Sequence, residues 1–209
     1  SHLDGNMIVL KFGGTSVGSA EMMDKALDIT ISRLDRGPVL VSSAMSKVTD
    51  SLLKLTHLAV AGDGDGAVKV AEEIIKRHLA VAESFLSGRN LADAGARIGE
   101  MRRALLSLAK GLSLLKECSP RTSDAVVAFG ELLSTTLLAA RARERGYASD
   151  CVDSRDFMRT DDRFTSAAPD MREIKKLARR KLKPAPRKIV VCQGFIGSTA
   201  DGVTTTLGR

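Results

Sequence analysis

Residues Lys11 to Ser16 read KFGGTS and have the composition of a phosphate-binding loop. Adjacent glycines let backbone amides approach an oxyanion closely, and the lysine adds a full positive charge beside them. An apolar run precedes the loop and an amphipathic stretch follows it, so we expect a strand-to-helix junction where the helix dipole attracts anions. The spacing matches neither the Walker A loop nor the dinucleotide-binding glycine pattern. The residues that we predict to bind phosphate are Lys11, Gly13, Gly14, Thr15 and Ser16.

Hydroxyl side chains, among them Ser43 and Thr49, follow the next apolar run in the segment Ser42–Asp50. Ligands of open α/β sheets bind outside the carboxyl ends of the strands, so these hydroxyls are expected to face the same crevice as the glycine loop. The residues alone favour a plainer interpretation, in which Ser46 or Thr49 caps the helix that follows.

Glu131 lies in the middle of a predicted helix, among apolar residues, and the pair Ser119–Pro120 is a typical helix start. A carboxylate in apolar surroundings is costly to bury unless it meets a cation. Glu131 therefore either faces solvent or meets a charged ligand.

Two arginine-containing segments are further candidates. Arg209 follows Gly208 after a threonine-rich stretch, and its planar guanidinium is suited to gripping a carboxylate or phosphate. The other segment, Arg159–Phe164, reads RTDDRF. The plainer interpretations are a β-strand for the threonine-rich stretch and a charged surface hairpin for Arg159–Phe164.

The chain is basic, with 32 Lys and Arg against 25 Asp and Glu and a formal net charge of +7. This balance suits an anionic ligand. A nucleic-acid-binding module would use the basic run Arg179–Lys188, but we interpret that run as a solvated helix end. Phe, Tyr and Trp number only 6, 1 and 0, which leaves few rings for stacking on bases. We expect no nucleic-acid partner.

Three cysteines, Cys118, Cys151 and Cys192, are widely spaced and form no metal-binding pattern, so we predict buried thiols and no metal site. The histidines His57 and His78 are expected on the surface or in packing. We find no membrane-length apolar run and no secretion signal, and therefore expect no membrane partner and a cytoplasmic location. The first six residues, 1–6, look like a cloning remnant.

Apolar runs predict buried parallel strands at 7–12, where Lys11 interrupts the run, and at 39–44. Two further strands are predicted at 148–152 and 188–192. A strand, helix and strand open the chain, which favours a parallel sheet with helices on both faces. An Asp-Gly turn predicts a β-hairpin over 195–207.

Residues 49–145 are predicted to be almost wholly helical, with breaks at 62–66, 88–90 and Ser119–Pro120. A further helix is expected over 170–182. The fold class is therefore α/β, with a helical subdomain inserted between strands. Because the chain stops directly after a predicted strand, we expect a truncated piece of a longer protein.

Five segments occur in the order found in one known family: 11–17, 41–50, 119–131, 159–170 and 193–209. Together they resemble the N-terminal part of the catalytic domain of an aspartokinase, of the amino acid kinase family. The resemblance covers nearly the whole chain. It implies a three-layer αβα sandwich around a mostly parallel sheet, and it makes 7–209 the amino-acid-binding lobe, incomplete at its C-terminus.

Aspartokinases transfer the γ-phosphoryl group of ATP to the side-chain carboxylate of L-aspartate, giving 4-phospho-L-aspartate. The resemblance therefore implies the first step toward lysine, threonine and methionine, with ATP and Mg²⁺ entering together and no tightly bound cofactor. It also implies a homo-oligomeric full-length protein. Because the nucleotide lobe is missing, the isolated chain is expected to transfer little or no phosphate.

The resemblance also assigns roles to residues. Lys11 would bind the ATP phosphates and stabilise the transferring group, Glu131 would pair with the ammonium of aspartate, and Arg209 would grip a substrate carboxylate. Lys11 and Arg209 are thus the implied catalytic residues. The implied amino-acid-binding residues are Ser43, Thr49, Glu131, Phe164 and Arg209.

One residue departs from the family pattern. Lys47 stands where the family usually has glycine, which would alter the loop or place an extra cation near the substrate. The glycine loop is broadly shared, so kinases of glutamate, acetylglutamate, carbamate or UMP remain alternatives, with a basic nucleic-acid-binding module behind them.

Overall fold

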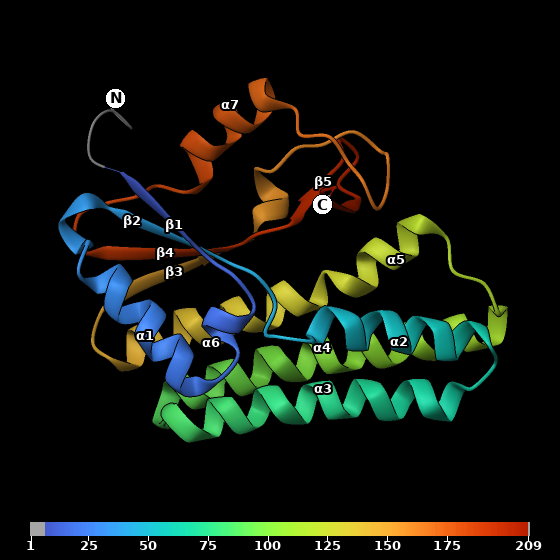
Figure 1. Ribbon diagram of the computed structural model, residues 1–209. Coiled ribbons are helices and arrows are strands. Elements are labelled where there is room, and N and C mark those ends of the chain that lie inside the picture. The colour runs from blue at the N-terminus through green and yellow to red at the C-terminus, as the bar shows by residue number, and fades with distance from the viewer. Residues whose placement is uncertain (1–6, 209) are drawn as a thin grey trace.

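The structure is a computed structural model that describes residues 7–208 (Figure 1). The predicted cloning remnant, 1–6, and Arg209 lie outside the described residues. The strands are β1 (Ile8–Phe12), β2 (Pro38–Ser42), β3 (Ala148–Val152), β4 (Lys188–Gln193), β5 (Ile196–Ser198) and β6 (Thr204–Thr206). The α-helices are α1 (Ala20–Ile31), α2 (Val48–Val60), α3 (Gly64–Phe85), α4 (Gly88–Leu115), α5 (Pro120–Val127), α6 (Phe129–Glu144) and α7 (Met171–Lys181). Three short 3₁₀ turns are η1 (Thr15–Val17), η2 (Leu34–Arg36) and η3 (Ser154–Asp156).

A four-stranded parallel sheet has the order β1-β2-β4-β3. Leu10 lies opposite Leu40, and Leu40 lies opposite Val191 on β4. Strands β5 and β6 form a separate antiparallel pair. The predicted parallel sheet and the predicted hairpin are both confirmed. The prediction that the first strand is buried is wrong, because β1 lies at the edge of the sheet and none of its residues is buried.

Helices cover both faces of the parallel sheet, as Figure 1 shows. On one face, Leu177 and Leu182 at α7 pack toward Val39 and Val190 of the central strands. On the other face, α1 and α6 bury Leu27 and other aliphatic side chains in the main core. This is the three-layer αβα sandwich that the resemblance implied.

The inserted helical subdomain consists of α2 to α6 and lies between β2 and β3 in the sequence. The predicted break at 62–66 ends earlier than expected, at Gly64, and the break predicted at 88–90 lies at 86–87 instead, because a glycine begins the next helix in both places. Helix α3 starts at Gly64, and Asp63 is its N-cap: the Asp63 side chain accepts a hydrogen bond from the Gly66 amide (2.9 Å). Helix α4 starts at Gly88. The predicted start at Ser119–Pro120 is confirmed, since Ser119 Oγ accepts the Thr122 amide at 3.1 Å.

The expectation that the chain has no membrane-length apolar run is wrong for one stretch. Pro120–Glu144, which forms α5 and α6, is long and apolar enough to cross a membrane by length and composition. In this fold 78% of its most apolar window is buried inside the protein. The apolar side chains of α6 thus form the core between the sheet and the other inserted helices.

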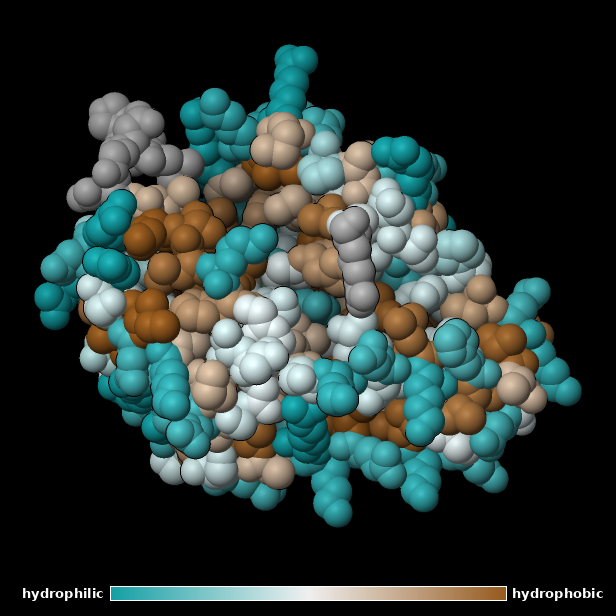
Figure 2. Space-filling model, viewed as in Figure 1, coloured by the Kyte–Doolittle hydropathy of each residue, from teal (hydrophilic) through white to brown (hydrophobic). Residues whose placement is uncertain are grey.

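The burial of the cysteines, the histidines and the basic run can be compared with the predictions. Of the three predicted buried thiols only Cys192 is buried, whereas Cys118 is half-buried and Cys151, on edge strand β3, is exposed. His57 is exposed on the surface, and His78 is fully buried in the helical core. Both agree with the expectation of a surface or packing residue. The basic run at the end of α7 is solvated, and Figure 2 shows hydrophilic side chains over that helix at the top of the view.

Candidate functional site

A pocket of about 390 Å³ lies where the loops after β1 and β2 meet the start of α6. The two loops are joined by hydrogen bonds from the Ser43 amide to the Phe12 carbonyl (3.0 Å) and from the Ser46 amide to the Gly14 carbonyl (3.1 Å). The pocket therefore lies outside the carboxyl ends of two parallel strands, as expected. Its lining residues are Gly14, Ser43, Ala44, Met45, Ser46, Lys47, Thr49, Asp50, Glu131 and Phe195.

Four of the residues predicted for phosphate or amino acid binding line this pocket: Gly14, Ser43, Thr49 and Glu131. Lys11 is exposed on β1, opposite Val41, and does not line the pocket. Phe164 is half-buried and also lies outside the lining, where Phe195 is the aromatic residue instead.

The glycine loop does not run directly into a helix. Gly13 is followed by Gly14 and the 3₁₀ turn η1, which contains the exposed Thr15 and the half-buried Ser16. Helix α1 begins only at Ala20, where Ser19 caps it by accepting the Met22 amide. The predicted junction of the glycines with a helix N-terminus is therefore wrong.

Close packing explains the second glycine. A Cβ atom on Gly14 would lie 3.0 Å from the Ala44 carbonyl oxygen, so a side chain there would push the two loops apart. Gly14 is needed where the backbones of the two loops come together.

Lys47 is the N-cap of α2, and its backbone is left-handed, with φ 69° and ψ 0°. No side chain caps this helix. The interpretation that Ser46 or Thr49 is a cap is therefore wrong, because the cap position falls on Lys47. The Thr49 side chain lines the pocket instead.

Glu131 lies in the first turn of α6 rather than in the middle of a helix, because the chain breaks between α5 and α6 at Ala128. It is 3% exposed. Oε1 accepts a long hydrogen bond from the Ala44 amide (3.3 Å), and Oε2 has no partner among residues 7–208. Burial raises the pKa of Glu131 to about 7, against the lowering effect of backbone hydrogen bonds. Its carboxylate thus borders the pocket with one oxygen free for a cation.

The first turns of α6 hold the loop after β2 in place. A Cβ atom on Gly130 would come within 2.7 Å of the Ala44 Cβ, so only glycine allows this approach. Ser134 Oγ donates to the Ser43 carbonyl at 2.7 Å. One face of α6 therefore positions both Glu131 and the Ser43 loop.

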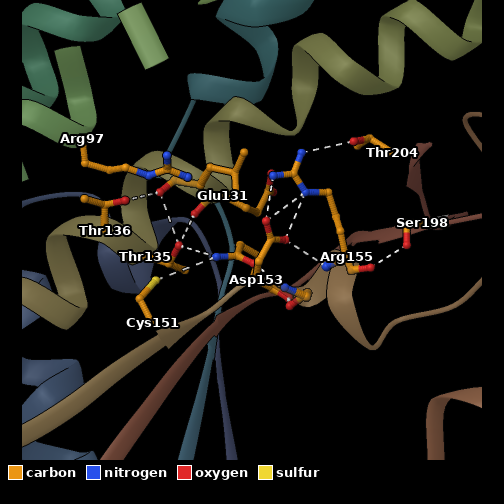
Figure 3. A network of polar contacts seen from close by, with 12 residues as sticks. Arg97, Glu131, Thr135, Thr136, Cys151, Asp153, Arg155, Ser198 and Thr204 are labelled. Carbon is orange, nitrogen blue, oxygen red and sulfur yellow. Dashed lines mark hydrogen bonds and ion pairs between the residues drawn. The ribbon is translucent and has the colours of Figure 1, made fainter. Parts of the chain in front are cut away.

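Beneath the pocket, a polar network links α6 to the strand ends (Figure 3). Thr135 Oγ1 donates to the Glu131 carbonyl (2.7 Å) and accepts from Gln193 Nε2 (2.9 Å). Gln193 Oε1 in turn accepts the Ser154 amide at 2.8 Å. The network fixes the start of α6 relative to β3 and β4.

Two positioning residues escaped the sequence analysis. Arg77 on α3 donates from Nη1 to the Ser46 carbonyl (2.7 Å) and from Nη2 to the Gly18 carbonyl (3.1 Å). It thereby ties together the two loops that form the pocket. The only signal in the sequence is an arginine on an amphipathic helix, which is typical of a solvated side chain.

The second such residue is Asp124 on α5, which is 1% exposed. Its Oδ2 accepts the amides of Thr165 and Thr206 (both 2.9 Å), and its Oδ1 accepts the Thr206 hydroxyl (2.7 Å). These bonds hold β6 and the loop after η3 against α5. No spacing in the sequence marks an aspartate for this role.

No group of three or more His, Cys, Asp or Glu side chains is placed to hold a metal ion within residues 7–208. The site is thus built from loop amides, hydroxyls, two carboxylates and one lysine.

Comparisons with known proteins show the family of this chain. The model of the amino acid kinase family matches residues 6–209. The lysine-sensitive aspartokinase 3 of Escherichia coli is 34% identical over 97% of this chain and 43% of its own length. A bifunctional aspartokinase/homoserine dehydrogenase of Arabidopsis thaliana is 31% identical over 96% of this chain and 22% of its own.

Solved structures give the same result. The crystal structure of E. coli aspartokinase III in complex with aspartate and ADP has a TM-score of 0.82 and 33% identity, covering 97% of this chain and 44% of that one. The complex of the same enzyme with lysine and aspartate has a TM-score of 0.83. The resemblance to aspartokinases is confirmed, and the chain spans less than half the length of these relatives.

Proposed function

We propose, from the premise that this chain belongs to the amino acid kinase family, that it is the amino-acid-binding part of an aspartate kinase. The single observation that carries the proposal is Glu131, a buried carboxylate whose free oxygen borders a pocket lined by hydroxyls. An α-ammonium group is the cation that an amino acid would bring to it. The aspartokinase relatives favour L-aspartate over the other substrates of the family.

The chemistry needs positioning more than proton transfer. The side-chain carboxylate of aspartate, with a pKa near 4, is already ionised at neutral pH and attacks phosphorus without a general base. Glu131 holds the ammonium, and Ser43 and Thr49 donate hydrogen bonds to the substrate. Lys11 and Arg209 are proposed to neutralise charge on the transferring phosphoryl group and on a carboxylate. ATP is expected to enter as its Mg²⁺ complex.

The rest of a longer protein is proposed to complete the enzyme. Residues 7–209 supply the amino acid side of the site, and the segment beyond supplies most of the nucleotide side. The isolated chain is therefore expected to release little or no ADP with aspartate and ATP. Robust ADP release from the isolated chain would contradict this division. A cytoplasmic homo-oligomer remains our proposal for the whole protein.

The test uses the full-length protein, with hydroxamate trapping of the acyl phosphate and coupled ADP release. L-aspartate, L-glutamate and acetylglutamate are offered in turn. We expect hydroxamate only with L-aspartate. If another acid is preferred, the aspartate assignment is wrong.

A variant of the carboxylate then tests the pocket. Glu131→Gln removes the charge that pairs with the ammonium, and we expect the KM for L-aspartate to rise about 10-fold or more. The exposed residue Glu83, changed to Gln, is the matched control and should leave KM unchanged. Equal KM values for the two variants would remove Glu131 from the site.

A further inference from the structure

Lys47 adopts a backbone conformation that a lysine rarely accepts. Its φ of 69° lies in the left-handed region, where a Cβ atom crowds the following carbonyl oxygen and glycine is the favoured residue. The helix gains no side-chain cap from it. Six non-glycine residues among 7–208 have a positive φ, and two of them, Lys47 and Phe195, line this pocket. Residues held in such conformations are found at binding sites when the surrounding structure supports them.

Lys47 is also the one cationic residue that lines the pocket among the described residues. Among the described residues, the lining holds two carboxylates, Asp50 and Glu131, and a single cationic side chain, Lys47. Within the described part of the chain, no carboxylate lies within ion-pair distance of Lys47. Lys47 is exposed, and its ammonium has no ion-pair partner among residues 7–208.

A dicarboxylic amino acid needs more than one cation. At neutral pH aspartate has two carboxylates and one ammonium. Glu131 suits the ammonium but repels both carboxylates. Lys11 does not line the pocket, so Lys47 is the one lining cation of residues 7–208 that could offset this repulsion.

We propose that Lys47 is a substrate-binding residue whose ammonium holds the side-chain carboxylate that receives the phosphoryl group. This inference rests on the proposed function. One oxygen of that carboxylate attacks the γ-phosphorus, the bond from phosphorus to the β,γ-bridging oxygen breaks, and ADP leaves with the bonding electron pair. Lys47 keeps its proton throughout; it orients the nucleophile and reduces the repulsion between two anions.

Replacement by glycine separates this role from a structural one. Lys47→Gly relieves the backbone strain and removes the charge, so the full-length variant should unfold at a higher temperature than the wild type. Its KM for L-aspartate should nevertheless rise about 10-fold or more, because a charge-assisted contact is lost. If Lys47→Gly keeps the wild-type KM and kcat, the proposal is wrong.

Two further variants complete the set. Lys47→Arg keeps the charge and should recover most of the loss in KM. Lys54, an exposed lysine on the same helix that does not line the pocket, is the matched control, and Lys54→Gly should leave KM unchanged. A KM for Lys47→Arg as high as that of Lys47→Gly would overturn the charge argument.

The experiment distinguishes failure of the proposed function from failure of the role proposed for Lys47. If the wild type phosphorylates another amino acid that carries a second carboxylate, the aspartate assignment falls, and Lys47 is judged by the same KM comparison on that acid. If the wild type phosphorylates no carboxylate, both proposals fall.

Discussion

At the scale of single residues, Glu131 links binding to proton release. Its carboxylate is buried with one oxygen unpaired among the described residues, and burial holds its pKa at about 7. Near neutral pH the empty pocket therefore contains both protonation states. An ammonium beside Glu131 favours the charged form and lowers the pKa, so binding of the amino acid should expel a proton.

This coupling predicts a pH dependence. As the pH falls below about 7, the KM for L-aspartate should rise in the wild type, because Glu131 must lose its proton to bind the ammonium. In Glu131→Gln the KM should be high and nearly flat across the same window. Initial rates from about pH 5.5 to about pH 8.5 test this, and calorimetry in buffers of different ionisation enthalpy counts the proton. Binding without proton release would contradict it.

Glu131 and Lys47 differ in how far their roles can be predicted from the sequence. The sequence makes Glu131 a candidate, because a carboxylate among apolar residues is costly to bury without a cation. Its pairing with an ammonium is implied only by the family resemblance. The conformation of Lys47 is not predictable, because nothing in a lysine predicts a positive φ. The family pattern marked Lys47 only as a departure from glycine, and the structure gives the physical meaning of that departure.

At the scale of elements, helix α3 controls the pocket without lining it. Arg77 reaches from α3 to the carbonyl groups of Ser46 and Gly18, which lie on different loops. The hydrogen bonds span 31 and 59 residues of sequence, so no local pattern predicts them. By contrast, the start of α5 was predictable because Ser119 and Pro120 act within a single turn.

The variant Arg77→Ala tests this positioning role. Removing both donors should lower the free energy of unfolding by about 1–3 kcal/mol, because two partly buried carbonyl groups lose their partner. The looser loops should also raise the KM for L-aspartate. The exposed neighbour Lys76, changed to Ala, is the control for stability and kinetics. Loss of stability with unchanged KM would restrict Arg77 to a structural role.

At the scale of the whole molecule, two buried groups give stability opposite dependences on pH. Burial lowers the pKa of His78 to about 4, so its contribution is present above about pH 6.5 and is lost as the pH falls toward 4. The raised pKa of Glu131 acts in the other direction: its contribution is present below about pH 4.5 and is lost as the pH rises through about 7. Between about pH 4.5 and 6.5 the two effects oppose each other.

Replacing His78 should reveal the contribution of Glu131 to the pH dependence of stability. In His78→Leu the free energy of unfolding should fall less steeply with acid than in the wild type, by on the order of 1–3 kcal/mol at about pH 4.5. Urea unfolding measured over a pH series tests this. His57 is exposed, so His57→Leu should keep the wild-type slope. Parallel pH profiles for His78→Leu and the wild type would contradict the assignment.

The overall architecture was predictable because its signals are long and repeated. Apolar runs predict the strands at the start of the chain, and helical periodicity predicts the inserted subdomain. The edge strands β1 and β3 contain no buried residue, so an apolar run does not by itself show burial. The glycine loop was less predictable: its glycines were interpreted as the start of a helix, but Gly14 serves the close approach of two loops. Local sequence patterns predict strands and helices. They do not predict a contact between two loops that are distant in the sequence, because that contact forms only in the folded chain.

The strand order has a consequence for synthesis. Strand β2 pairs with β1 on one side and with β4 on the other, and Leu40 and its partner Val191 are about 150 residues apart. At about 5–20 residues per second, a ribosome needs roughly 8–30 s to supply the second partner. During that interval the apolar edge of β2 is open to other chains. We therefore expect the nascent protein to be prone to aggregation until the sheet closes.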